Sequence, residues 1–295
     1  MDTRLLRTFL VLARTGSFTA TAAELHVVQS TVTGHVQALE RRLGTRLFDR
    51  LPGGARLTDA GRRVAGPARD LLDDQQRLLD AAGAGGAPAG EVTIGATESV
   101  CAYRLPPVIA ALAARQPGVR VHLTPAGTAA ALGALTGPDG RLDIALLLDD
   151  DLPGDLPARR IGREPIEVVG AAGHPATDGP RSWAQLAEQP WFLLEEGCSY
   201  TDRFVRELAA GAPAHPRITR FGSIEAVRSC VAAGLGLAVL PRVAVAAGLA
   251  DGSLRRVAGV PRPDVPLSLL TDHRRRPSAA VAAVASAVES AAANW

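Results

Sequence analysis

A run of short polar side chains between residues 29 and 37 is the part of the chain best suited to hydrogen bonding with a partner surface. The run reads Gln-Ser-Thr-Val-Thr-Gly-His-Val-Gln and contains no acidic side chain. Hydroxyl, amide and imidazole groups can bond to the edges of DNA bases and to phosphate oxygens. The candidates for such bonds are Gln29, Ser30, Thr31, Thr33 and His35. A solvated helix surface is the alternative interpretation of the same pattern.

Apolar residues within this run indicate the element that holds it. Val32, Val36, Leu39 and Leu43 are spaced by four, three and four residues, which is one face of a helix over about residues 29–43.

The segment before this helix has the pattern of a second, shorter helix. Ser17 and Thr19 are helix-capping residue types that stand just before an alanine-rich stretch, residues 20–25. Residues 26–28 then make a short connection. The order of helix, tight connection and helix predicts a helix-turn-helix.

A hairpin is predicted directly after the second helix. Residues 52–54 read Pro-Gly-Gly, a turn signal between the short apolar runs 47–48 and 55–57. Arg50 and Arg56 flank this turn, and we expect both side chains to contact phosphates.

The distribution of charge supports a DNA-binding end. Residues 1–63 hold 10 Arg and 5 acidic residues, whereas the whole chain has a net charge of only +2. A nearly neutral chain therefore concentrates positive charge where the motif lies. We expect residues 1–58 to form a winged helix-turn-helix domain that binds double-stranded DNA.

The same segment resembles the DNA-binding domain of LysR-type transcriptional regulators. The matching positions are Gly16-Ser17-Phe18-Thr19, Ala22, Leu25, Gln29, Val32, Leu39-Glu40, Leu43-Gly44, Leu47-Phe48, Arg50, Leu57-Thr58 and Ala60-Gly61. The chain departs from the family pattern at Thr21, Val28 and Thr33. Val28 stands where a Ser or Thr usually caps the second helix, a loss of about 1 kcal/mol of helix stability.

A long helix is expected over residues 59–82, with Pro67 kinking it or shifting its start. Its apolar seam has alternating spacings of four and three and consists of Val64, Ala68, Leu71, Gln75, Leu78 and Ala82. One alternative is a helix packed on its own domain; the other, which the resemblance also implies, is a dimerisation helix.

We interpret residues 59–90 as the connector, with residues 83–90 forming a flexible Gly- and Ala-rich linker. A dimer would match two heads to a pseudo-palindromic site. The resemblance further implies a tetramer.

The remainder, residues 91–295, alternates strand and helix patterns and predicts an α/β domain with mostly parallel sheets. The expected strands are 92–94, 119–123, 144–148, 168–170, 192–194, 237–240 and 267–270. The expected helices are 105–115, 128–135, 201–210, 223–233 and 279–293.

This region resembles the effector-binding domain of the same family, whose fold is similar to that of periplasmic binding proteins. The matching marks are residues 92–95, Leu105-Pro106, Pro117 with Val119, residues 142–145, His174-Pro175 and residues 231–236 leading to Leu240-Pro241. The resemblance implies subdomain I (residues 91–163 and 267–295) and subdomain II (164–266), with the chain crossing near 161–167 and 265–270.

Hydroxyl-bearing residues follow the expected strands where α/β proteins bind ligands. We predict an effector site composed of Thr97, Ser99, Thr128, Cys198, Ser199, Tyr200 and Ser223. Hydroxyls and amides at helix starts favour a small organic anion as the effector. Ordinary helix capping is the alternative for each hydroxyl.

Composition excludes several classes of function. All 32 basic residues counted as Lys plus Arg are Arg, so a Walker A loop and Schiff-base chemistry are ruled out. The three Cys and six His lack metal-ligand spacing. We expect no cofactor other than the effector, no metal, no catalytic residue and no membrane span. The N-terminal pattern is an amphipathic helix instead of a secretion signal, which predicts a cytoplasmic protein and excludes a periplasmic solute carrier.

Two further functions compete with an effector-responsive regulator. A redox-responsive regulator would use Cys101, Cys198 or Cys230, and Cys198 stands at an expected helix start that would lower a thiol pKa. An enzyme would use Gly197-Cys198-Ser199 as a nucleophile turn, although no His stands nearby in the sequence to act as the base.

Overall fold

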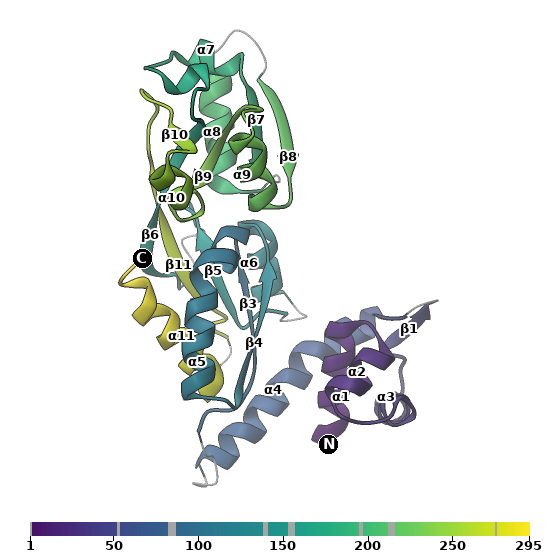
Figure 1. Ribbon diagram of the computed structural model, residues 1–295. Helices are drawn as coiled ribbons and strands as arrows, with labels where there is room; N and C mark the ends of the chain where they lie inside the picture. The colour runs from purple at the N-terminus through teal and green to yellow at the C-terminus, as the bar shows by residue number, and fades with distance from the viewer. Residues whose placement is uncertain are drawn as a thin grey trace.

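The computed structural model describes residues 2–51, 54–81, 87–137, 141–152, 157–194, 197–211, 216–274 and 276–295. Figure 1 shows a small helical head, a long helix leading away from it, and a body in which two α/β subdomains follow one another. The predicted fold class, a winged helix-turn-helix followed by an α/β domain, is confirmed.

The head has the order helix, helix, helix, hairpin. Its elements are α1 (Thr3–Thr15), α2 (Phe18–Glu24), α3 (Gln29–Leu43), β1 (Phe48–Leu51) and β2 (Gly54–Leu57). Phe9, Leu12 and Leu39 are fully buried at its centre. The glycine at position 44 ends α3 with a φ of 67°, a left-handed conformation that glycine adopts without strain. The turn residues Pro52 and Gly53 lie outside the described residues.

Helix α4 (Asp59–Ala81) is continuous across Pro67, so the prediction that this proline shifts the start of the helix is wrong. Ala65 and Ala68 are buried against the head, whereas Leu71 and Leu78 are 45% and 71% exposed. Packing against α1 supports the first half of this helix, which explains why it tolerates a proline. Residues 82–86 of the predicted connector lie outside the described residues.

Subdomain I is built on three parallel strands, β3 (Gly90–Ala96), β4 (Val119–Pro125) and β5 (Ile144–Leu148). A single π-helical turn (Val100–Arg104) leads into α5 (Leu105–Arg115). Its other helices are α6 (Thr128–Thr136) and α11 (Ala279–Ala292). Helix α11 packs against α5 and β3, so the end of the chain returns to this subdomain (Figure 1).

Subdomain II repeats the strand and helix alternation. Its elements are a 3-10 turn (Pro175–Thr177), α7 (Trp183–Ala187), β7 (Pro190–Leu194), α8 (Ser199–Ala210), β8 (Arg217–Phe221), α9 (Ile224–Ala232), β9 (Leu237–Pro241), α10 (Arg242–Asp251) and β10 (Leu254–Arg256). Strand β7 is paired in parallel with β8 and β9. Trp191 is fully buried and contacts Phe204 of α8 with their rings 4.8 Å apart.

Two long strands join the subdomains, β6 (Arg159–Ala171) and β11 (Asp264–Thr271). The expected crossings at 161–167 and 265–270 fall within β6 and β11. Both strands run antiparallel to their neighbours, and the sheet order is β4-β3-β5-β11-β6-β9-β7-β8, with β10 on β6. The expectation of mostly parallel sheets is therefore wrong at the centre, because strands that cross between subdomains return in the opposite direction.

No helix within the described ranges is long and apolar enough to span a membrane. Within the same ranges, no group of three or more His, Cys, Asp and Glu residues is placed to hold a metal ion.

Candidate DNA-binding face and effector cleft

The polar face of α3 is open at its start. Gln29 and Ser30 are exposed, while Thr31 and Thr33 are half-buried. These four side chains come from the first turns of α3: Ser30 faces away from the buried row, Thr31 and Thr33 flank it, and Gln29 stands at the exposed start of the helix. The arrangement can present hydrogen-bonding groups to base edges in a major groove.

His35 differs from the other predicted base-reading residues. Its Nδ1 lies 2.8 Å from Oγ1 of Thr8, a residue of α1 that is 2% exposed. The imidazole therefore ties α3 to α1, and its Nδ1 is occupied by this bond. Position 35 stands three residues after Val32 and four before Leu39, so the helical spacing already placed it beside the buried row.

The connection between α2 and α3 lacks two features that usually stabilise such a turn. Val28 is the N-cap of α3, makes no side-chain bond to the helix and is 66% exposed. His26 has a φ of 53°, the left-handed region that non-glycine residues rarely adopt. The sequence predicts that Val28 cannot cap α3, and the structure confirms that no side chain at this position bonds to the first N–H groups of the helix.

The wing presents its arginines from both strands. Arg50 pairs with Ala55 and Arg56 pairs with Asp49 across the hairpin, and both arginines are exposed. The Arg50 guanidinium carbon also lies 5.6 Å from the centre of the Phe18 ring, a cation–π contact that orients it against α2.

Glu40 anchors the wing to α3, a role that the sequence did not reveal. Its Oε1 accepts hydrogen bonds from the backbone N–H groups of Leu47, at 2.8 Å, and Phe48, at 3.3 Å. The strand that carries Arg50 therefore starts at a fixed position relative to α3.

In the body, the predicted effector residues gather where the two subdomains meet. Thr97 and Ser99 follow β3, are 9% and 1% exposed, and have their hydroxyl oxygens 3.3 Å apart. Thr128 is the first residue of α6 and is half-buried. All three belong to subdomain I.

The start of α8 faces them from subdomain II. Ser199 donates a hydrogen bond to the carbonyl oxygen of Leu148 at 2.6 Å, which connects α8 with the end of β5. Tyr200 is 5% exposed, and its hydroxyl has no hydrogen-bond partner among the residues described. Burial raises the pKa of this phenol well above its usual value, so the group is a neutral hydroxyl.

Cys198 does not have the electrostatic environment that its position suggested. Burial raises the pKa of the Cys198 thiol, and the hydroxyl of Thr201 donates to its sulfur at 3.3 Å. The expectation of a lowered pKa is wrong, because desolvation at this helix start outweighs the hydrogen bonds that favour a thiolate. Burial likewise raises the pKa of Cys101 to about 11.

Ser223 caps α9, accepting a hydrogen bond from the Ala226 N–H at 3.4 Å. The next backbone N–H of α9, that of Ile224, is also bonded: it donates to Oε2 of Glu98 at 3.1 Å. Glu98 stands between Thr97 and Ser99 and belongs to the opposite subdomain. Sequence reasoning selected its two neighbours and missed Glu98 itself.

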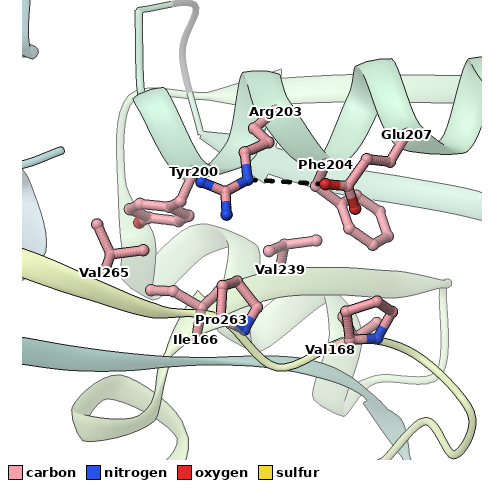
Figure 2. A pocket seen from close by; sticks show the side chains of 10 residues that line it. Ile166, Val168, Tyr200, Arg203, Phe204, Glu207, Val239, Pro263 and Val265 are labelled. Atoms are coloured by element: carbon pink, nitrogen blue, oxygen red, sulfur yellow. Dashed lines mark ion pairs between the residues drawn. The ribbon is translucent and has the colours of Figure 1, made fainter. Parts of the chain in front are cut away.

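A separate cavity of about 50 Å³ lies between α8 and the strands of subdomain II. Figure 2 shows Arg203, Phe204 and Glu207 on the α8 side, with Ile166 and Val168 opposite them. The Arg203–Glu207 ion pair stands at the exposed side of an otherwise apolar lining. Of the predicted effector residues, only Tyr200 lines it.

Comparison with known proteins identifies both parts of the chain. Residues 3–62 match the model of the bacterial regulatory helix-turn-helix protein, lysR family, and residues 85–293 match the LysR substrate binding domain.

The uncharacterized HTH-type transcriptional regulator YwqM of Bacillus subtilis (strain 168) is 34% identical over 260 residues, covering 87% of this chain and 88% of that protein. A probable hydrogen peroxide-inducible genes activator of Mycobacterium avium is 32% identical over 250 residues, covering 81% and 78% of the two chains. A full-length OxyR variant from Pseudomonas aeruginosa has 26% identity and a TM-score of 0.71, covering 99% of this chain and 94% of that one. The chain therefore belongs to the LysR family of transcriptional regulators and has the family's DNA-binding head and effector-binding domain.

Proposed function

We propose that this regulator binds a pseudo-palindromic DNA site as a dimer of heads and that a small molecule in the cleft between the subdomains changes the arrangement of those heads. The observation that carries the proposal is the exposed apolar stripe of α4. Leu71 and Leu78 point away from the head on the helix that joins it to the effector-binding domain. A second copy of α4 would bury this stripe at the predicted heptad positions.

In this proposal α3 enters the major groove and the wing contacts the backbone. Gln29 and Ser30 are the most exposed polar groups at the start of α3, which suits them to base edges. Arg50 and Arg56 supply charge for phosphates without sequence discrimination.

The effector would act on the contacts that bridge the two subdomains. Besides the Ser199 and Glu98 bonds, Tyr103 donates to Glu225 at 3.4 Å, and an Arg203–Asp150 ion pair also crosses the cleft. A ligand that replaces some of these contacts binds one arrangement of the subdomains more tightly than another. The sequence-based prediction of an anionic group on the effector remains part of the proposal.

The proposal is tested by footprinting the DNA upstream of the regulator's own gene with the full chain and with Leu78→Asp. The wild type should protect two half-sites separated by whole helical turns. Leu78→Asp should sediment as a monomer and lose cooperative protection, while Leu79→Asp, at an exposed position outside the predicted heptad seam, serves as the control. Protection of one half-site by both wild type and variant would contradict the paired arrangement.

Cys198 is a weaker candidate for a redox or nucleophilic role. The related activator from Mycobacterium avium gives a reason to test it, but burial raises the Cys198 pKa and so lowers the thiolate fraction. Similarity to transcriptional regulators also points away from enzymatic activity. We expect peroxide to leave DNA binding by the wild type and by Cys198→Ser unchanged; a peroxide response that Cys198→Ser abolishes would establish the redox function instead.

A further inference from the structure

Glu98 is a carboxylate of subdomain I that reaches across the cleft to subdomain II. It follows β3, is half-buried, and accepts one hydrogen bond, from the N–H of Ile224 at the start of α9. The two residues are 126 positions apart in the chain. Glu98 therefore lies where the two subdomains meet, with part of its side chain still exposed.

No positively charged side chain lies within ion-pair distance of Glu98 in the described parts of the chain. The other carboxylates of the cleft are compensated: Glu164 is bonded by Arg104 at 2.7 Å, and Glu225 is paired with Arg228. Burial and the charge of Glu225 raise the pKa of Glu98. The Glu98 carboxylate is thus partly desolvated without a cationic partner. Its ionised form therefore costs free energy when no ligand is bound.

A second polar group, at the start of α8, also lacks a partner. The Tyr200 hydroxyl is buried with no hydrogen-bond partner among the described residues, and its pKa is raised first by burial and then by Cys198, Glu98 and Glu164. Buried polar groups are normally hydrogen-bonded, so the orphaned Tyr200 hydroxyl and the uncompensated Glu98 carboxylate are groups that a ligand can complete. The hydroxyls of Thr97 and Ser99, on either side of Glu98, add further donors and acceptors.

We infer that the effector carries an ammonium group, which Glu98 binds, and that an α-amino acid or similar zwitterion is the class of ligand this cleft selects. The inference rests on the proposed function, because it assigns chemistry to the same effector cleft. The ammonium group pairs with the free side of the Glu98 carboxylate, while the carboxylate of the ligand takes hydroxyl donors of Thr97, Ser99 and Tyr200.

An effector with negative charge alone fits this cleft less well. The amide of Ile224 that would receive an anion at the start of α9 already donates to Glu98. A simple carboxylate would have to displace that side chain or lie beside its negative charge. The two cases give opposite results when Glu98 loses its charge: an ammonium ligand loses affinity, whereas a simple carboxylate gains it.

The experiment compares matched ligands on matched variants by isothermal titration calorimetry of the full chain. The probes are the common amino acids and the primary diamine putrescine, set against the 2-oxo and 2-hydroxy acids that replace the ammonium group. Glu98→Gln keeps an oxygen for the Ile224 N–H and removes only the charge. Glu98→Asp keeps the charge, and Glu188→Gln neutralises an exposed carboxylate elsewhere in subdomain II.

We expect at least one ammonium compound to bind at millimolar concentration or below and its 2-oxo acid to bind more weakly. Glu98→Gln should weaken that binding by about tenfold or more, since a charge-assisted hydrogen bond is lost. Glu98→Asp should keep the preference for the ammonium compound, and Glu188→Gln should match the wild type.

The inference is overturned if no ammonium compound binds, if the 2-oxo acid binds as tightly, or if Glu98→Gln leaves the affinity unchanged or raises it. Thermal unfolding of each variant shows whether it is folded. If Glu98→Gln does not fold, the ligand preference of Glu98→Asp still tests the inference. Mobility shifts with the upstream DNA, without ligand, separate the two proposals. If the protein binds DNA but shows no preference for ammonium compounds, the ammonium inference is wrong and the proposed function stands. If the wild type does not bind DNA, the proposed function is wrong.

Discussion

Replacing Glu40 by alanine tests whether one carboxylate fixes the wing on the recognition helix. The change removes an acceptor shared by the N–H groups of Leu47 and Phe48, which are 0% and 5% exposed. A hydrogen bond to a charged group contributes about 1.5–3 kcal/mol, and the longer bond adds about 1 kcal/mol. The free energy of unfolding of the head should therefore fall by about 2.5–4 kcal/mol, within the range that large single substitutions reach.

Urea unfolding of the full chain, followed by circular dichroism and by loss of DNA binding, measures this change for the head separately from the body. Glu40→Gln keeps a carbonyl acceptor and should cost about 1 kcal/mol. Glu24→Ala breaks only a partly exposed ion pair with Arg14 and should cost less than about 1 kcal/mol. If Glu40→Ala and Glu24→Ala lose equal stability, or if Glu40→Gln is as damaging as alanine, the carboxylate does not hold the wing.

Three further substitutions in the head and one in the cleft have expected outcomes of different kinds. Val28→Ser should raise the stability of the head by about 1 kcal/mol by supplying the missing cap, and Val27→Ser should not; chemical unfolding measures both. His35→Ala should lower stability by removing the bond to α1 while leaving base preference unchanged, as selection of binding sites from random DNA would reveal. Arg50→Ala should weaken binding to all sequences and reduce the slope of affinity against salt by about 1. For Glu98, a raised pKa means that its contribution to stability is present below the usual value of 4.5 and is lost as the pH rises through the folded-state pKa. Glu98→Gln should therefore gain stability relative to the wild type as the pH rises above the usual value of about 4.5, and a difference in thermal unfolding that does not change with pH would contradict this.

Elements with a strong local signal were predictable from the sequence. The expected bounds 105–115 and 144–148 agree with α5 and β5, because a helical period with a proline at its start and a short run of five apolar residues each have few alternatives. The predicted recognition helix, 29–43, agrees with α3 for the same reason. In each case the apolar spacing alone sets the register of the element.

Elements that depend on the rest of the fold were missed. Strand β8 reads Arg-Ile-Thr-Arg-Phe, and as the edge strand of its sheet it needs no apolar run. Helix α10 follows β9 without a break, so its apolar residues merge with those of the strand. The residues of the site show the same division: the exposed start of α3 followed from periodicity, whereas the partners of Glu40 and Glu98 depend on how distant segments meet.

The free energies of the contacts between the two subdomains limit how far an effector can shift the arrangement of those subdomains. Hydrogen bonds such as Ser199 to Leu148 and Ile224 to Glu98 contribute about 0.5–1.5 kcal/mol each, or somewhat more where a charge takes part. A ligand that replaces one or two of them shifts the balance between subdomain arrangements by about 1–3 kcal/mol, the usual range of allosteric coupling.

That shift has a short route to the DNA-binding end. Arg14 of α1 lies 3.9 Å from Glu91 of β3, and Arg77 of α4 donates to the carbonyl oxygen of Arg276 at 2.9 Å. Strand β3 runs from the Arg14 contact at one end to Thr97 and Glu98 just beyond the other. We propose that a change in how Glu98 is held acts on β3, the strand whose other end the head contacts through Arg14 and Glu91.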